Sequence, residues 1–174
     1  DVTVLCAKPG NKANSQWTAD VEGLDVVEYN DKLGRKYFMP SNKFSSKLIY
    51  RCLVIWAKLF SKGWIYDMAV FSAKSMAKKA KQIVTEKGIN NIVVTGTSYR
   101  LCYYVTLLKK EIPHVNIIAD IRDPWTMDMY RFSGLSEADE EYEKQMEASV
   151  VHNCDQLVAV NDSIADFYKS NFPD

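Results

Sequence analysis

Residues 115–126 read VNIIADIRDPWT, and this stretch decides the fold. Its first five residues, 115–119, are almost wholly apolar and favour β-structure, which predicts a strand buried on both faces. A charged cluster closed by a Pro-Trp pair follows at once: Asp120, Arg122, Asp123, Pro124 and Trp125. Ligands bind where the carboxyl ends of parallel strands meet, so the cluster is a candidate site. The alternative is that both aspartates only cap a turn while Arg122 pairs with one of them.

Strand and helix patterns alternate on both sides of this stretch. Strands are predicted at residues 91–95, 115–119 and 156–160, and helices at 98–110, 137–153 and 163–171. This alternation predicts an α/β fold, a Rossmann-like parallel sheet with helices on both faces. Further strands are predicted at 1–7 and 24–29, a polar loop at 11–20, and helices at 45–62 and 67–87. A chain of 174 residues fits one such domain.

Composition excludes several classes of protein. The chain has 22 Lys plus Arg and 22 Asp plus Glu. It therefore lacks the excess of basic residues that would indicate a nucleic-acid partner. Its four cysteines lie far apart and it has two histidines, so neither a metal site nor a disulfide framework is indicated. The motifs GxGxxG, GxxxxGK[ST] and GxSxG are absent, and no cofactor is expected in this chain. Without a membrane span or signal peptide, a cytoplasmic setting with reduced thiols is expected.

Charge is uneven along the chain, however. No acidic residue occurs between Asp31 and Asp67, whereas residues 35–64 contain seven basic side chains among many aromatic ones. The helix predicted at 45–62 has an apolar stripe and a basic side, so residues 35–64 are a candidate contact with an anionic inner-leaflet membrane surface. The alternative is a helix packed on the sheet with a solvated basic face.

Two further strand ends are expected at the same edge of the sheet as the charged cluster. The first carries Thr97, Ser98, Tyr99 and Arg100 after Gly96; free helix amides could hold an anion there, and Arg100 could contact phosphate or carboxylate. Capping alone also explains Thr97 and Ser98. The second carries Asn161, Asp162 and Ser163 before the last helix; Ser163 and Asp166 have the spacing of a capping box there, so a structural role is favoured.

Residues 91–174 resemble the amino-terminal domain of the family 4 glycosyltransferases, which have the two-domain GT-B fold. The resemblance is carried by IADIRDPWT at 118–126, by the acidic helix with Glu143 and Glu147, by CDQLVAVN at 154–161 and by the Phe-Pro pair at 172–173. DVTVLCAKPG at 1–10 is similar to the second strand of that domain, and the middle of the chain matches only loosely. The family's first strand, glycine-rich loop and helix, and its carboxy-terminal donor domain, have no counterpart here. The chain is therefore expected to be a fragment of a larger enzyme and to be inactive alone.

The resemblance implies a retaining sugar transfer from a nucleotide-sugar donor, held by the donor domain, to a sugar or lipid-linked sugar acceptor. It implies Asp123, with Asp120 as the alternative, as the acceptor of the hydroxyl proton, and both Arg122 and Arg100 as groups that bind acceptor phosphate or stabilise charge. Trp125 would stack on a sugar face, beside Thr97, Ser98, Tyr99, Asp120 and Asn161. The rival interpretations are a nucleotide-sugar epimerase of the same architecture and a non-catalytic membrane-surface module.

Overall fold

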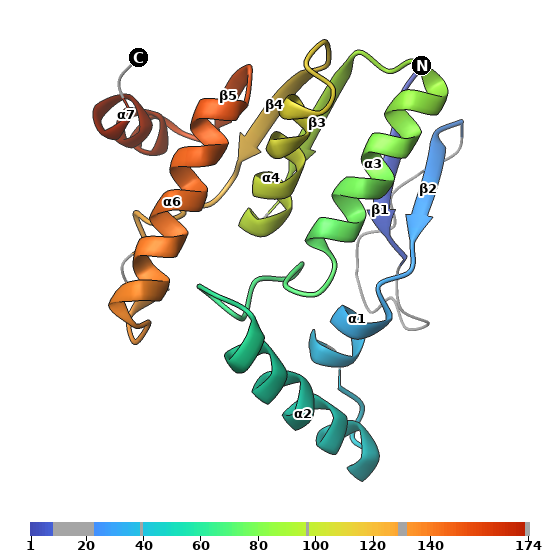
Figure 1. Ribbon diagram of the computed structural model, residues 1–174, viewed down its shortest axis with the longest axis vertical. Helices are drawn as coiled ribbons and strands as arrows, with labels where there is room; N and C mark the ends of the chain where they lie inside the picture. Colours follow the sequence, from blue (N-terminus) through green and yellow to red (C-terminus); the bar gives the residue numbers. More distant parts are fainter. Residues whose placement is uncertain (9–22, 39, 97, 129–131, 173–174) are drawn as a thin grey trace.

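The computed structural model describes residues 1–8, 23–38, 40–96, 98–128 and 132–172. Figure 1 shows an α/β fold with two groups of parallel strands and helices packed against them. The α/β class with parallel strands is therefore confirmed. The polar loop predicted at residues 11–20 lies outside the described residues.

The larger sheet has the strand order β3-β4-β5, and all of its strands are parallel. Its strands are β3 (Asn91–Thr95), β4 (Asn116–Ile121) and β5 (Gln156–Ala159), close to the predicted ranges. The register sets Thr95 beside Asp120 and Asp120 beside Val158. The three carboxyl ends therefore share one edge, as the alternation predicts.

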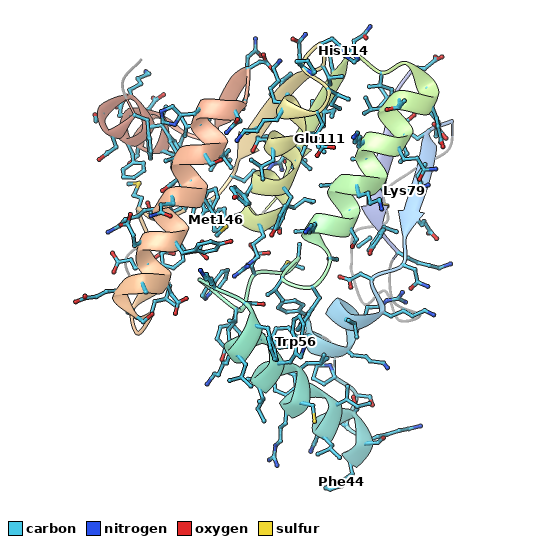
Figure 2. All side chains as sticks on the ribbon, viewed as in Figure 1. Phe44, Trp56, Lys79, Glu111, His114 and Met146 are labelled. Atoms are coloured by element: carbon cyan, nitrogen blue, oxygen red, sulfur yellow. The ribbon has the colours of Figure 1, made fainter. Side chains whose placement is uncertain are left out.

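One face of this sheet carries the core. The helices packed there are α3 (Ala73–Lys87), α4 (Tyr99–Thr106), the 3-10 turn η1 (Leu107–Lys110), α6 (Glu137–Asn153) and α7 (Asp162–Asn171). Alternate residues of β4, Ile117, Ala119 and Ile121, point into this layer and are at most 1% exposed. Met146 of α6 lies between α6 and α4 (Figure 2). The buried face of β4, formed by every second residue, thus packs against the apolar faces of the helices in one continuous core.

The opposite face of the larger sheet is open in the described part of the chain. Val93 is 61% exposed, Val158 46%, and Val160, just after β5, 59%. Asp120 belongs to this face, because it alternates with the buried Ala119 and Ile121 along β4. Asp120 therefore lies on the side of the sheet away from the helices.

The smaller sheet pairs β1 (Thr3–Ala7) with β2 (Asp25–Tyr29) in parallel. Among the described residues β1 and β3 do not pair with each other. A groove of about 1160 Å³ lies between them and is lined by both strands and by apolar side chains of α3, including Met76, Ile83 and Val84. Two strand edges with free backbone groups thus border one groove.

Helices α1 (Lys32–Phe38) and α2 (Phe44–Phe60) form a separate part of the structure below the sheets in Figure 1. Their contacts with the body are aromatic: the ring centroids of Tyr37 and Phe71 are 5.1 Å apart, and those of Trp56 and Phe71 5.4 Å apart. The sequence did not predict α1. None of the helices in the described ranges combines the length and apolar character needed to cross a membrane.

Candidate functional site

A hydrogen-bonded group of polar side chains lies at the carboxyl edge of the larger sheet and consists of Thr95, Asp120 and Arg122. The register of β3 and β4 places Thr95 beside Asp120, so that Thr95 Oγ1 donates a hydrogen bond to Asp120 Oδ2. Arg122 Nε donates to the same oxygen at 3.0 Å. Asp120 therefore fixes the position of the Arg122 guanidinium as the chain leaves β4.

The electrostatics of this group leave a charged guanidinium exposed beside a charged carboxylate. The hydrogen bond from Thr95 and then that from Arg122 hold the pKa of Asp120 below its usual range, so its carboxylate is charged at neutral pH. The Arg122 side chain is 63% exposed, and its two terminal nitrogens have no partner among the described residues. These nitrogens form the planar fork that binds phosphate or carboxylate.

Asp123 follows Arg122 directly and is half-buried. Its carboxylate has no hydrogen bond or ion pair within the described ranges, while its backbone oxygen lies 3.5 Å from the Tyr99 hydroxyl that donates to it. An exposed guanidinium therefore lies next in sequence to a carboxylate that has no partner in the described part of the chain. That pairing of residue types can orient a charged substrate and accept a proton.

Tyr99 and Trp125 lie beneath this surface rather than on it. Their rings stack with centroids 4.6 Å apart and planes at 10°, and both residues are at most 1% exposed. The Tyr99 hydroxyl donates to Pro124 O at 2.7 Å. The expectation that Trp125 stacks on a sugar face is corrected, because Tyr99 already covers its ring and no solvent reaches it.

Arg100 also differs from the expectation. It is 6% exposed, and its guanidinium donates to the backbone oxygen of Lys62 and, at 3.3 Å, to that of Trp64. Arg100 thus binds the chain segment that follows α2. Its burial leaves no surface for an acceptor phosphate, so this role is corrected too.

Ser98 and Asn161 are both helix caps. Ser98 Oγ accepts from Leu101 N at 3.3 Å, and Asn161 Oδ1 accepts from Ile164 N at 3.0 Å. The capping interpretation of Ser98 is therefore confirmed, whereas the last helix begins one residue earlier than predicted and is capped by Asn161 rather than by Ser163. Asn161 remains exposed at the edge shared with Arg122, whereas Thr97 lies outside the described residues.

Sequence reasoning assigned no role to Asp67, a buried carboxylate that organises the start of α4. Asp67 is 1% exposed and accepts from Ser98 Oγ at 2.7 Å, from Ala69 N at 2.8 Å and from Arg100 N at 3.1 Å. Burial raises the pKa of Asp67, although these hydrogen bonds oppose the shift. No local pattern distinguishes Asp67 from an ordinary helix-start aspartate.

Glu143 and Glu147 of α6 hold the loop that follows β4. Glu143 accepts from Trp125 Nε1 at 2.9 Å and from Trp64 N at 2.7 Å. Glu147 accepts from Tyr168 Oη at 2.8 Å and from the Thr126 hydroxyl. Burial raises the pKa of both carboxyls. Their spacing with buried Met146 and Val150 is the sequence signal that both glutamates face inward.

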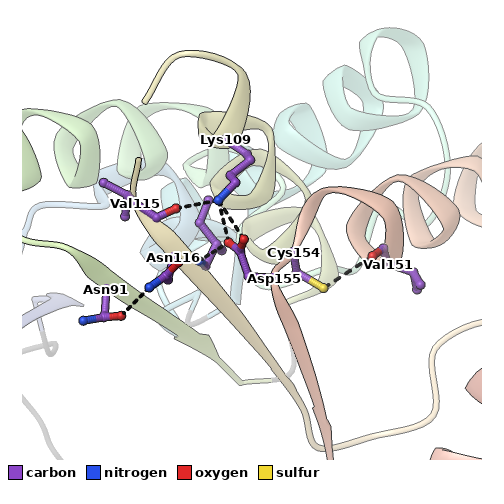
Figure 3. A network of polar contacts seen from close by, with 8 residues as sticks. Asn91, Lys109, Val115, Asn116, Val151, Cys154 and Asp155 are labelled. Atoms are coloured by element: carbon purple, nitrogen blue, oxygen red, sulfur yellow. Dashed lines mark hydrogen bonds and ion pairs between the residues drawn. The ribbon is translucent and has the colours of Figure 1, made fainter. Parts of the chain in front are cut away.

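The opposite edge of the sheet carries a structural network, shown in Figure 3. Lys109 Nζ lies 2.7 Å from Asp155 Oδ1 and donates to Val115 O at 3.0 Å, and Asp155 Oδ2 accepts from Ile117 N at 2.8 Å. The hydrogen bonds from Lys109 and Ile117 hold the pKa of Asp155 below its usual range. This network joins the amino ends of β4 and β5.

The described residues contain no cluster of three or more His, Cys, Asp or Glu side chains that could hold a metal ion. The four cysteines are free. Comparisons of the chain with protein-family models, with curated proteins and with solved structures found no match.

Proposed function

We propose that this chain is the acceptor-side part of a retaining glycosyltransferase, inactive alone because the donor domain lies outside it. The observation that carries the proposal is the Asp120–Arg122 contact, which holds an exposed guanidinium at the carboxyl edge of a parallel sheet, with Asp123 next in the sequence. The acceptor is a glycan, lipid-linked sugar or small molecule. The reaction is expected on the cytoplasmic side of the membrane, where nucleotide sugars would be available and thiols stay reduced.

The chemistry assigns separate roles to the two neighbours. Arg122 binds the phosphate or other anionic group of the acceptor and keeps it in register. Asp123 accepts the proton of the acceptor hydroxyl as its oxygen bonds to the anomeric carbon of the donor sugar. The bond from that carbon to the nucleoside diphosphate breaks, and the diphosphate leaves with the electron pair.

The groove between β1 and β3 supports the idea that the chain is part of a larger domain. A further parallel strand in the groove would pair with both free edges and join the two sheets. The apolar side chains of α3 that line the groove would cover such a strand. The family that residues 91–174 resemble has a first strand with no counterpart among the described strands.

The test uses the longest natural reading frame that contains this chain. Release of nucleoside diphosphate and transfer to acceptor would be measured with a panel of nucleotide sugars. Asp123→Asn is expected to lower turnover by orders of magnitude with folding intact, and Arg122→Ala to raise the acceptor KM. The matched control is Asp166→Asn, which removes a carboxylate that is 73% exposed on α7. Near-normal turnover of the Asp123 variant would remove Asp123 from the mechanism.

A second candidate is a non-catalytic membrane-surface module. In that case the Arg122–Asp120 pair would have only a structural role and would hold the end of β4 in place. The two candidates separate in the same assay, because a module releases no nucleoside diphosphate with any donor. An epimerase would change the donor sugar without an acceptor.

A further inference from the structure

Helix α2 exposes an apolar stripe along its length. Phe44 is 84% exposed, Leu48 54%, Ile55 58% and Leu59 71%. Their spacing of 4, 7 and 4 residues sets them on one side of the helix. Figure 1 shows α2 projecting from the body, with Phe44 at its far end in Figure 2. The sheet therefore does not cover this stripe.

A basic stripe runs beside the apolar one. Lys47, Arg51 and Lys58 are exposed and have the same spacing of 4 and 7 residues as Phe44, Leu48 and Ile55, displaced by three positions along the sequence. None of the three forms an ion pair within the described ranges, and α2 itself contains no acidic residue. Thus no ion pair with the described residues neutralises their positive charge.

The body holds α2 with this side outward. Ala57, on the opposite side of the helix, is fully buried. After α2 the chain is fixed by hydrogen bonds from and to its backbone: Gly63 N donates to Asp139 Oδ1 at 2.7 Å and Trp64 N to Glu143 Oε1 at 2.7 Å, and the Arg100 guanidinium donates to Lys62 O and Trp64 O. These bonds connect the end of α2 to α4 and α6. The exposed stripes therefore belong to a fixed element.

We propose that α2 lies in the interface of an anionic lipid membrane, parallel to its plane. The apolar stripe would enter the acyl boundary, while Lys47, Arg51 and Lys58 would contact anionic headgroups. The exposed aromatic rings of Trp56 and Phe60, 48% and 70% exposed, suit the same depth. A protein partner would need acidic groups facing the basic stripe and an apolar groove beside it. An anionic bilayer offers negative headgroups and an apolar interior along its whole surface.

The membrane contact is independent of sugar transfer, since vesicle binding requires no donor domain. If the proposed transferase is correct, α2 brings the Arg122 edge to lipid-linked acceptors. Flotation can succeed while the transfer assay fails, and the reverse is equally possible. A negative flotation result would therefore contradict only the membrane contact, and a negative transfer assay only the proposed transferase.

The experiment is flotation of the full chain with vesicles of phosphatidylcholine mixed with phosphatidylglycerol, and of phosphatidylcholine alone. Binding is expected to the mixed vesicles and to weaken as salt increases. Each basic residue near an anionic surface strengthens binding about fivefold, so Lys47→Glu with Lys58→Glu is expected to weaken it at least tenfold. The matched control is Lys74→Glu with Lys78→Glu, which makes the same charge change at exposed positions of α3.

A second variant tests the apolar stripe. Phe44→Ser with Leu59→Ser removes two exposed side chains without changing the core, and it is expected to weaken binding at least tenfold with unchanged thermal unfolding. No binding to the mixed vesicles at low salt would overturn the proposal, as would an equal loss in the α3 control. It would also be overturned if the apolar variant converted a dimer into a monomer and left flotation unchanged. In that case α2 would be a contact between copies of this chain.

Discussion

Trp125 donates its indole hydrogen bond to Glu143 inside the core, with Nε1 and Oε2 2.9 Å apart. Glu143 is 2% exposed and also accepts from Trp64 N, so one carboxylate joins the loop after β4 to the segment after α2. Both the candidate site and the attachment of α2 depend on this side chain. Its removal should therefore affect the whole fold.

Glu143→Leu is expected to lower the free energy of unfolding by about 3 kcal/mol, because two buried N–H donors lose their acceptor. Chemical denaturation followed by circular dichroism measures the change. The control is Glu141→Leu on the exposed side of α6, where the carboxylate accepts a hydrogen bond from the side chain of Gln145 and the cost should stay within about 0.5 kcal/mol. Equal costs for the two variants would contradict the inward role of Glu143.

Glu147 should make stability depend on pH. Burial raises its pKa in the folded protein, so its contribution is fully present below the unfolded pKa and is lost as pH rises through the folded value. Glu147→Gln removes this titration. The destabilisation caused by Glu147→Gln is therefore expected to be larger at low pH than at high pH, as measured by denaturation across the range. A destabilisation that grows with pH would show that the sign of the shift is wrong.

Two glycines with similar backbone angles allow strain and crowding to be separated. Gly88, which ends α3, has φ +64°, and no atom lies within 4 Å of the place a Cβ would take, so Gly88→Ala should cost about 1 kcal/mol from backbone strain alone. Gly63 has φ +73°, and an added Cβ would overlap the Glu143 carboxylate. Gly63→Ala is expected to cost clearly more in thermal or chemical unfolding. Similar costs would mean that the Glu143 side chain can move away freely.

Local patterns predicted most of the strands and helices. The β-branched run of β3 and the acidic first turn of α6 predicted the bounds that both elements have, Asn91–Thr95 and Glu137–Asn153. Helix α1 was missed because Asp31 and Gly34, which follow the predicted strand at 24–29, are residues typical of a turn. In the structure Asp31 Oδ1 accepts from Gly34 N at 2.8 Å at the start of that helix. The helical pattern of a short helix with a central glycine is too weak to outweigh these turn residues.

The site was predicted less well, because the partners that decide exposure are distant in sequence. Arg100 is buried by its hydrogen bonds to the segment after α2, 36 to 38 residues earlier, and Trp125 by Glu143, 18 residues later. Neither partner can be identified from the spacing around the charged residues. The Arg122–Asp120 contact, two residues apart on one strand end, is local, and the sequence did predict it as an alternative.

Arg122 should matter for anion binding and little for stability. Its ion pair with Asp120 is at the surface, so Arg122→Ala is expected to change the free energy of unfolding by no more than about 1 kcal/mol. Loss of a charge-assisted hydrogen bond should weaken the binding of inorganic pyrophosphate, measured by calorimetry, about tenfold. Lys169→Ala is the control, since Lys169 is an exposed cation 3.7 Å from Asp166 on α7. If both variants bind pyrophosphate equally well, the Arg122 guanidinium is not the anion-binding group, and the Asp120 contact serves only to tie the end of β4.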